Sequence, residues 1–402
     1  MLEKVILESV EEENPDFDVD GYICLCILFS SFSISNWITP SIISLIGPRL
    51  CIAFGSMTFA LYIASFFYPI EWVLYLMSFL MGVGAACLWT GQGNYLTLIS
   101  TFATIQRNMS IFWVMYSSSL LIGSMIVYFE FRSKEVVDST TRFWLVAIFS
   151  TVAVIGCSTT LLLRKPPPKS EDDALPPEVK VGPLEALIKA LKLFITRDML
   201  LLNVAFFYSG LAFSFCTGVY ESCLGFTKVF PDRKELVGLS GIFIGAGNIF
   251  GGVIFGLLKT NLKTLHIVLT MGMSSSILGY LIIVLMLPKT SPFGETTESP
   301  IVTMHPQLTN LPSFLFGLGH ACYNVLLSST LILSYANNSP PAFAIFQFVQ
   351  SVGIAASFGY SSQLNLYFQI GLLIFFVTLG SALIFYLLMV STKLQLQQGE
   401  PT

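Results

Sequence analysis

The stretch RKPPPKSEDDALPPEVKVGPLEALIKALKLFITRD, residues 164–198, interrupts an otherwise apolar chain of 402 residues and decides how that chain is organised. It begins with consecutive prolines and an acidic run, which can bury little surface and favour a polar linker. Five apolar stretches precede the linker and six follow it, and each is long enough to cross about 30 Å of hydrocarbon. This order predicts two helical bundles joined by the linker.

The composition supports the same class of protein. Charged residues make up 11% of the chain and apolar residues 54%, with a mean hydropathy of +0.75, whereas soluble domains carry about a quarter charged residues. We therefore expect an all-α polytopic membrane protein with about 11 transmembrane helices. The expected spans are Tyr22–Ile46, Cys51–Tyr68, Glu71–Ile99, Asn108–Phe129 and Phe143–Leu163, then Met199–Thr227, Glu235–Leu258, Lys263–Leu287, Asn310–Tyr335, Pro341–Gln363 and Leu366–Ser391.

These spans define the expected domains. An acidic N-terminal segment covers residues 1–21, the first bundle residues 22–163, the second bundle residues 199–391 and a C-terminal tail residues 392–402. The loops on the side of the linker carry the larger share of Lys and Arg, which by the positive-inside rule predicts a cytoplasmic linker and a cytoplasmic C-terminus.

Several functional classes are disfavoured. The sequence contains no HExxH, CxxC or Walker-type motif, and its three histidines are scattered, so we expect no metal site, no cofactor and no enzyme. A net charge of −4, spread along the chain, argues against nucleic acid as a partner. The eight cysteines fall within apolar spans, where thiols act as small apolar groups, and we expect no structural disulfide. The predicted partner is the lipid bilayer.

The second part of the linker has the pattern of an amphipathic helix. Apolar side chains recur at helical spacing while charged ones occupy other positions of the wheel. The apolar set is Leu184, Leu187, Ile188 and Leu191, and the charged set is Glu185, Lys189 and Lys192. Two interpretations remain open: a helix that lies flat on the membrane, or a short solvated helix docked on the bundle.

Four strings carry a resemblance to a known family. They are NWITP at residues 36–40, LWTGQGN at 88–94, GLSGIFIG at 238–245 and PAFAIF at 341–346. Together with the linker between five and six spans, they resemble the uncoordinated-93-like branch of the major facilitator superfamily. Members carry one more helix at the N-terminus, and Lys4–Val10 looks like the end of that helix, so the first helix of the usual 12 is expected to be missing or truncated.

The resemblance implies a fold and two rival functions. The fold has two halves built from inverted repeats, with a solute site near the midplane and alternating access. The first function is transport of a small solute. The second is that of an accessory subunit that regulates a membrane channel or the trafficking of a receptor, as relatives in this branch are described. The plasma membrane and the endolysosomal membrane are both consistent with the resemblance.

Polar groups within the spans are candidate site residues, because such groups face a cavity or a partner inside a membrane. In the second bundle, His320 and Asn324 lie one turn apart and could bind a polar solute or relay a proton, or they could simply bond to neighbouring helices. Glu221 is a candidate ion or proton group, or an interfacial carboxylate. Asn248 lies among glycines whose spacing favours close helix packing.

The remaining candidates come from other spans. Gln92 and Asn94 flank Gly93, where the backbone can be approached closely, and Gln350 lies in the next-to-last span. Each amide either lines a solute cavity or bonds between helices. Gly47 and Arg49 correspond to the superfamily's cytoplasmic loop motif; the alternative for Arg49 is positive-inside anchoring. The scarcity of buried charge favours an uncharged solute or the accessory role.

Overall fold

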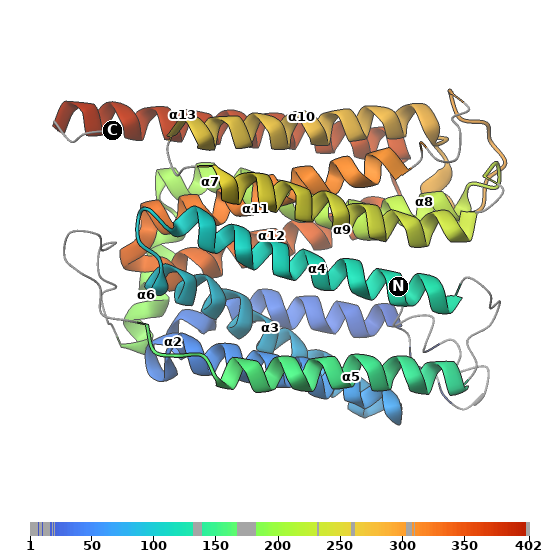
Figure 1. Cartoon of the computed structure of the whole chain (residues 1–402), viewed down its shortest axis with the longest axis horizontal. Helices are drawn as coiled ribbons and strands as arrows, with labels where there is room; N and C mark the ends of the chain where they lie inside the picture. The colour runs from blue at the N-terminus through green and yellow to red at the C-terminus, as the bar shows by residue number, and fades with distance from the viewer. Residues whose placement is uncertain are drawn as a thin grey trace. The chain divides into compact units, whose positions relative to one another are not determined.

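The computed structural model describes residues 21–131, 139–166, 182–230, 233–258, 262–302 and 310–398, with residues 7, 10, 17, 19 and 308. These residues form helices joined by turns, and an isolated parallel bridge links Thr227 to Thr296 (Figure 1). The predicted all-α class is therefore confirmed for this part of the chain. Most of the expected helix remnant Lys4–Val10 and residues 167–181 of the linker lie outside the described residues.

The helices follow the expected spans closely. The first half contains α2 (Gly21–Ala64), α3 (Glu71–Ile99), α4 (Ile105–Phe131), α5 (Ser139–Leu161) and the linker helix α6 (Pro183–Phe194). The second contains α7 (Arg197–Ser214), α8 (Tyr220–Phe226), α9 (Arg233–Leu257), α10 (Leu262–Met286), α11 (Leu311–Tyr335), α12 (Ser339–Ser361) and α13 (Leu366–Gln398). Short turns are η1 (Ser65–Phe67), η3 (Ser291–Phe293) and η5 (Ala336–Asn338), and η2 (Phe215–Val219) is a π-helical turn that joins α7 to α8.

Among the described residues, nine helical segments are long and apolar enough to cross a membrane, so the expected count of 11 is not confirmed. Two of these segments, Ile23–Phe67 and Leu311–Ser361, have 45 and 51 residues, far more than the roughly 20 that one crossing needs. The first bends at Gly47, whose φ of 79° lies in the region that favours glycine, and the following Pro48 lacks an N–H donor. The second is interrupted by η5.

The described residues cluster into two compact units. Unit 1 comprises the described parts of Met1–Thr101, Ser133–Phe194 and Leu331–Ser351. In it α2 packs against α3, α5 and α6. Small residues permit the close crossing of α2 and α3: a Cβ atom added at Gly55 would lie 2.6 Å from Leu88 Cβ. Ser31 on α2 also donates a 3.2 Å hydrogen bond to the Phe79 carbonyl on α3.

Unit 2 comprises the described parts of Phe102–Arg132, Ile195–Thr330 and Val352–Thr402. Within it α4 packs against α9, and α13 packs against both α7 and α10 (Figure 1). The glycines of α9 face two neighbours. Gly247 meets the backbone of α11 at Phe314, whereas Gly252 and Gly256 meet α4 at Val114 and Ser110. The packing role expected from the glycine spacing is confirmed.

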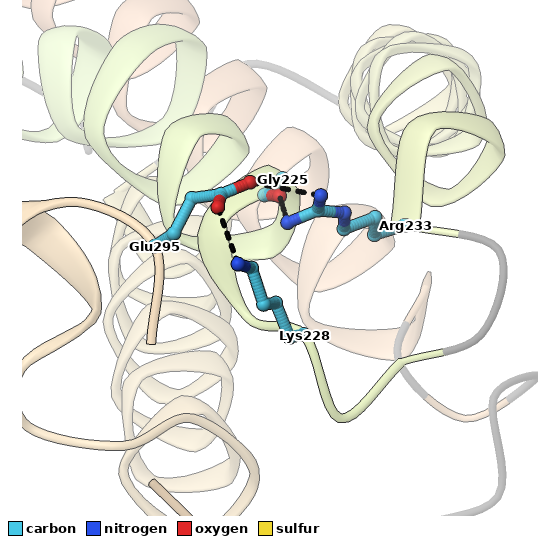
Figure 2. A network of polar contacts seen from close by, with 4 residues as sticks. All are labelled: Gly225, Lys228, Arg233 and Glu295. Atoms are coloured by element: carbon cyan, nitrogen blue, oxygen red, sulfur yellow. Dashed lines mark hydrogen bonds and ion pairs between the residues drawn. The ribbon is translucent and has the colours of Figure 1, made fainter. Parts of the chain in front are cut away.

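Loops at one end of unit 2 are joined by a group that we call the loop clasp: Lys228, Arg233, Glu295 and Thr296. Figure 2 shows Glu295 between the two cations, with its carboxylate oxygens 2.5 Å from Lys228 Nζ and 2.8 Å from Arg233 Nη2. The Lys228 amide donates to the Thr296 carbonyl at 3.0 Å. The clasp therefore ties the α10–α11 connection to the α8–α9 connection.

Candidate functional site

The centre of the candidate site is a hydrogen bond between α9 and α11. Asn248 Nδ2 donates to the Ile244 carbonyl at 3.0 Å, which leaves Asn248 Oδ1 directed at His320 Nδ1, 2.9 Å away. Because an amide oxygen only accepts hydrogen bonds, the neutral imidazole must carry its proton on Nδ1. The lone pair of His320 is then on Nε2, which can accept a hydrogen bond or a proton.

Aromatic rings surround His320. The Trp113 ring from α4 meets the imidazole edge-to-face with centroids 6.0 Å apart, and the Phe213 ring from α7 lies 5.8 Å away. Close helix packing sets this arrangement, because Gly317, one turn before His320, lies against the backbone of α9 at Ile244. The imidazole is thus positioned by three helices.

A small cavity lies beside His320 in unit 2. Residues of α7, α10 and α11 line most of it, among them Tyr208, Ser276, His320 and Asn324, and it has room for about one water molecule. Asn324 Nδ2 donates to the His320 carbonyl at 2.9 Å, while its buried Oδ1 has no hydrogen-bond partner among the described residues. A buried amide oxygen without a partner is costly, so this oxygen is suited to a hydroxyl donor from water or a solute.

Three tyrosines extend this polar region and were missed by sequence reasoning. Tyr208 and Tyr280 lie with their hydroxyl oxygens 3.2 Å apart, and the rings of Tyr208 and Tyr323 have centroids 5.0 Å apart. Tyr323 donates to the Val377 carbonyl at 3.1 Å and is also hydrogen-bonded to Ser381. A signal was available, because tyrosine is enriched at membrane interfaces and these three lie well inside their spans.

Glu221 lies in the first turn of α8, directly after the π-helical turn η2. Its side chain is partly exposed, and its Oε1 would lie 3.8 Å from a Cβ atom at Gly241 on α9. It does not line the cavity beside His320. The structure therefore brings Asn248, His320 and Asn324 together and leaves Glu221 separate from them.

The other candidates lie in unit 1. Asn94 is buried and donates a 2.8 Å hydrogen bond to Ser339 Oγ at the start of α12. The ring of Phe343 occupies the space beside Gly93, so the close approach expected there is made by the protein itself. Gln92 and Gln350 are both partly exposed.

Gly47 and Arg49 lie at the bend of α2. The positive φ of Gly47 explains why glycine is needed at this position. Arg49 is partly exposed, with its Nε buried and without a hydrogen-bond partner among the described residues. Among the residues that the structure describes, no group of three or more His, Cys, Asp or Glu side chains could hold a metal ion. All eight cysteines are free thiols.

Known proteins resemble the chain in sequence and in fold. Residues 17–385 match the family model described as ion channel regulatory protein UNC-93. UNC93-like protein MFSD11 of Xenopus tropicalis is 35% identical over 395 residues, covering 93% of this chain and 88% of that protein.

Two solved transporters share the fold. The proton:xylose symporter XylE, bound to 6-bromo-6-deoxy-D-glucose, aligns with a TM-score of 0.66 at 11% identity, covering 96% of this chain and 92% of that chain. The human organic anion transporter MFSD10 (TETRAN) aligns with a TM-score of 0.60 at 13% identity, covering 94% and 93%.

Proposed function

Because the chain belongs to the UNC-93 family and has the fold of major facilitator superfamily transporters, we propose that it moves an uncharged small solute across a membrane by alternating access. The chain is a transporter-like, multi-pass membrane protein.

The observation that carries the proposal is the group formed by Asn248, His320 and Asn324. It offers an acceptor at His320 Nε2 and an unpaired acceptor at Asn324 Oδ1, and the imidazole of His320 contacts the rings of Trp113 and Phe213. Acceptors for hydroxyl groups in a largely aromatic environment suit a polar and neutral solute such as a sugar. A charged solute would require a buried counter-charge.

The other candidate residues have subsidiary roles in the proposed transport. Gln92 and Gln350, which are partly exposed, contact the solute along its path, whereas Asn94 holds α3 to α12 through Ser339. Glu221 is the coupling group that takes up a proton, because it is the only carboxylate well inside a span among the described residues. Gly47 and Arg49 shape the bend of α2, which the proposal places on the cytoplasmic side.

Uptake into proteoliposomes tests the proposal. The purified chain is reconstituted, and entry of radiolabelled D-glucose and D-xylose is compared with entry of the anion p-aminohippurate. We expect saturable entry of a neutral sugar, abolished by His320→Ala and reduced by Asn324→Leu, but retained by Gly371→Ala, which alters an open glycine position. An inward proton gradient should stimulate the wild type and not Glu221→Gln. If the reconstituted protein is folded but sugar enters no faster than in protein-free liposomes, transport of neutral sugars is refuted.

The description of the family model favours a second candidate function. Relatives in the UNC-93 family are described as ion channel regulators, so the chain could act as an accessory subunit without transport. The test is cross-linking in intact membranes followed by mass spectrometry. Stoichiometric recovery of one channel or receptor, combined with absent uptake, would favour this role over transport.

We further propose that the C-terminus is cytoplasmic and that the protein resides in the plasma membrane or the endolysosomal membrane. The excess of Lys and Arg in the linker supports this orientation. A C-terminal epitope should be detected only after the plasma membrane is permeabilised, together with a marker of one of the two membranes. Detection on intact cells would reverse the orientation.

A further inference from the structure

The linker helix α6 is attached to α2 through its small side chains. Ala186 and Ala190 are only 3% and 1% exposed. Ser41 Oγ on α2 donates a 2.6 Å hydrogen bond to the Pro183 carbonyl at the start of α6. At its other end, Phe194 meets the Trp37 ring of α2 with centroids 5.5 Å apart. The alanine face, and not the leucine face, is therefore the face that docks on the protein.

The two attachment points also fix the direction of α6. Ser41 and Trp37 are four residues apart, about 6 Å along the axis of α2, whereas Pro183 and Phe194 are separated by about 16 Å along the axis of α6. A helix whose ends meet α2 at nearly the same height must cross it steeply, and Figure 1 shows α6 running crosswise to α2. Since α2 contains membrane spans, α6 lies roughly parallel to the membrane plane.

The side of α6 that faces away from α2 is apolar and uncovered. Leu184, Ile188 and Leu191 are 71%, 41% and 50% exposed, and they form one stripe at helical spacing, which we call the outer stripe. The charged side chains do not surround this stripe. Glu185 and Lys189, 3.6 Å apart, lie together on one flank of the helix, and the opposite flank carries Leu187. Such one-sided charge is typical of a helix between water and hydrocarbon.

The part of α2 around Ser41, where α6 begins, belongs to an outward-facing apolar surface. Ile38 and Leu45, about one turn before and after Ser41, are 52% and 69% exposed, although both belong to a segment that spans the membrane. These side chains share the face of α2 that carries Ser41. Helix α6 therefore begins on the lipid-facing side of α2, and its outer stripe continues that surface.

We propose that α6 is an interfacial membrane helix, whose outer stripe inserts at the boundary between lipid headgroups and acyl chains while its alanine face holds it against α2. The sequence left open whether this helix lies flat on the membrane or docks on the bundle, and the proposal combines the two. The helix is docked on the protein, and it also lies on the membrane. The surface is a lipid-binding site of the linker, separate from the polar group around His320.

Depth-dependent fluorescence quenching tests this proposal on the full chain in nanodiscs. A small fluorescent amino acid is incorporated at Leu184 or, as the matched control, at its neighbour Glu185, whose side chain is similarly exposed at 60%. A nitroxide near the start of the lipid acyl chain should quench the probe at 184 severalfold more strongly than at 185. Aqueous iodide should show the opposite preference.

The alternatives have distinct outcomes. Stronger iodide quenching at 184 than at 185 would show a solvated stripe, and protection of 184 from both quenchers would show a protein partner; either result overturns the proposal. Labelled protein must elute as a single species and melt like the wild type. If the probe at 184 prevents folding, Leu191 with Lys189 as its control provides the same comparison.

Discussion

Substitution of Gly317 by alanine tests the helix crossing that positions His320. At this crossing of α9 and α11, a Cβ atom on Gly317 would lie 2.8 Å from Asn248 N and 2.9 Å from Ile244 C, and closer still to the Ile244 carbonyl oxygen. Carbon atoms in good contact are about 3.5–4.0 Å apart, so the two backbones must separate by about 1 Å. Backbone atoms cannot rotate away as a flexible side chain would.

The cost follows from two opposing effects. Overpacking of a tight interior costs about 1–3 kcal/mol, and the backbone contact places this site near the upper end. Replacement of glycine by alanine within a helix returns up to about 1 kcal/mol. We therefore expect Gly317→Ala to lower the unfolding free energy by about 2 kcal/mol, which for a chain of 402 residues lowers the melting temperature by about 2–3 °C.

The assay is thermal unfolding in nanodiscs, followed by intrinsic tryptophan fluorescence. Gly371→Ala in α13 is the matched control, because no atom lies within 4 Å of a Cβ added there and its φ is not positive. This control should melt at or slightly above the temperature of the wild type. If Gly317→Ala melts as high as Gly371→Ala, the close crossing of α9 and α11 is refuted.

Three further changes test other contacts. Asn248→Leu should lower the unfolding free energy by about 1–3 kcal/mol, because it removes the acceptor of the imidazole Nδ1 proton; melting equal to the wild type would contradict that bond. Hydrogen bonds from Lys228 and Arg233 lower the pKa of the Glu295 carboxyl from its ordinary value of 4.5. The ionised carboxylate therefore stabilises the fold above pH 4.5, and this stabilisation is lost as the pH falls through the lowered pKa. The melting temperature of Glu295→Gln should accordingly fall less on acidification, whereas parallel pH profiles would argue against the clasp. Asn94→Leu should cost about 1 kcal/mol in the same assay through loss of a 2.8 Å hydrogen bond to α12, and an unchanged melting temperature would count against it.

The sequence predicted the class of protein and the family well. Long uncharged stretches are sufficient to identify membrane helices, and the strings at residues 36–40 and 88–94 led to the family that the comparisons confirm. The number of spans was harder to establish, because α2 passes through the bend at Gly47 without a loop. Hydropathy alone does not show whether one long helix or two shorter ones occupy such a stretch.

The site was predicted only in part. Asn248, His320 and Asn324 could be selected because polar groups are rare within spans, but the bond between Asn248 and His320 joins residues 72 positions apart. Pairing of that kind depends on which helices are neighbours, and a single sequence does not encode it in any local period. For the same reason the contact of Tyr208 with Tyr280 was missed. The sequence also did not predict that Phe343 fills the space beside Gly93.

The π-helical turn η2 changes the direction in which side chains point in the last part of the span Arg197–Phe226. A π turn holds one residue more than the α-helical turn that it replaces. Beyond Val219, every side chain therefore points about 100° away from the direction that an uninterrupted α-helix would give it. Removal of a single residue from Phe215–Val219 would leave the helix intact and its length almost unchanged, yet it would present Glu221 to a different neighbour. The one extra residue of the π turn therefore rotates the end of the helix and determines which neighbour the Glu221 carboxylate faces.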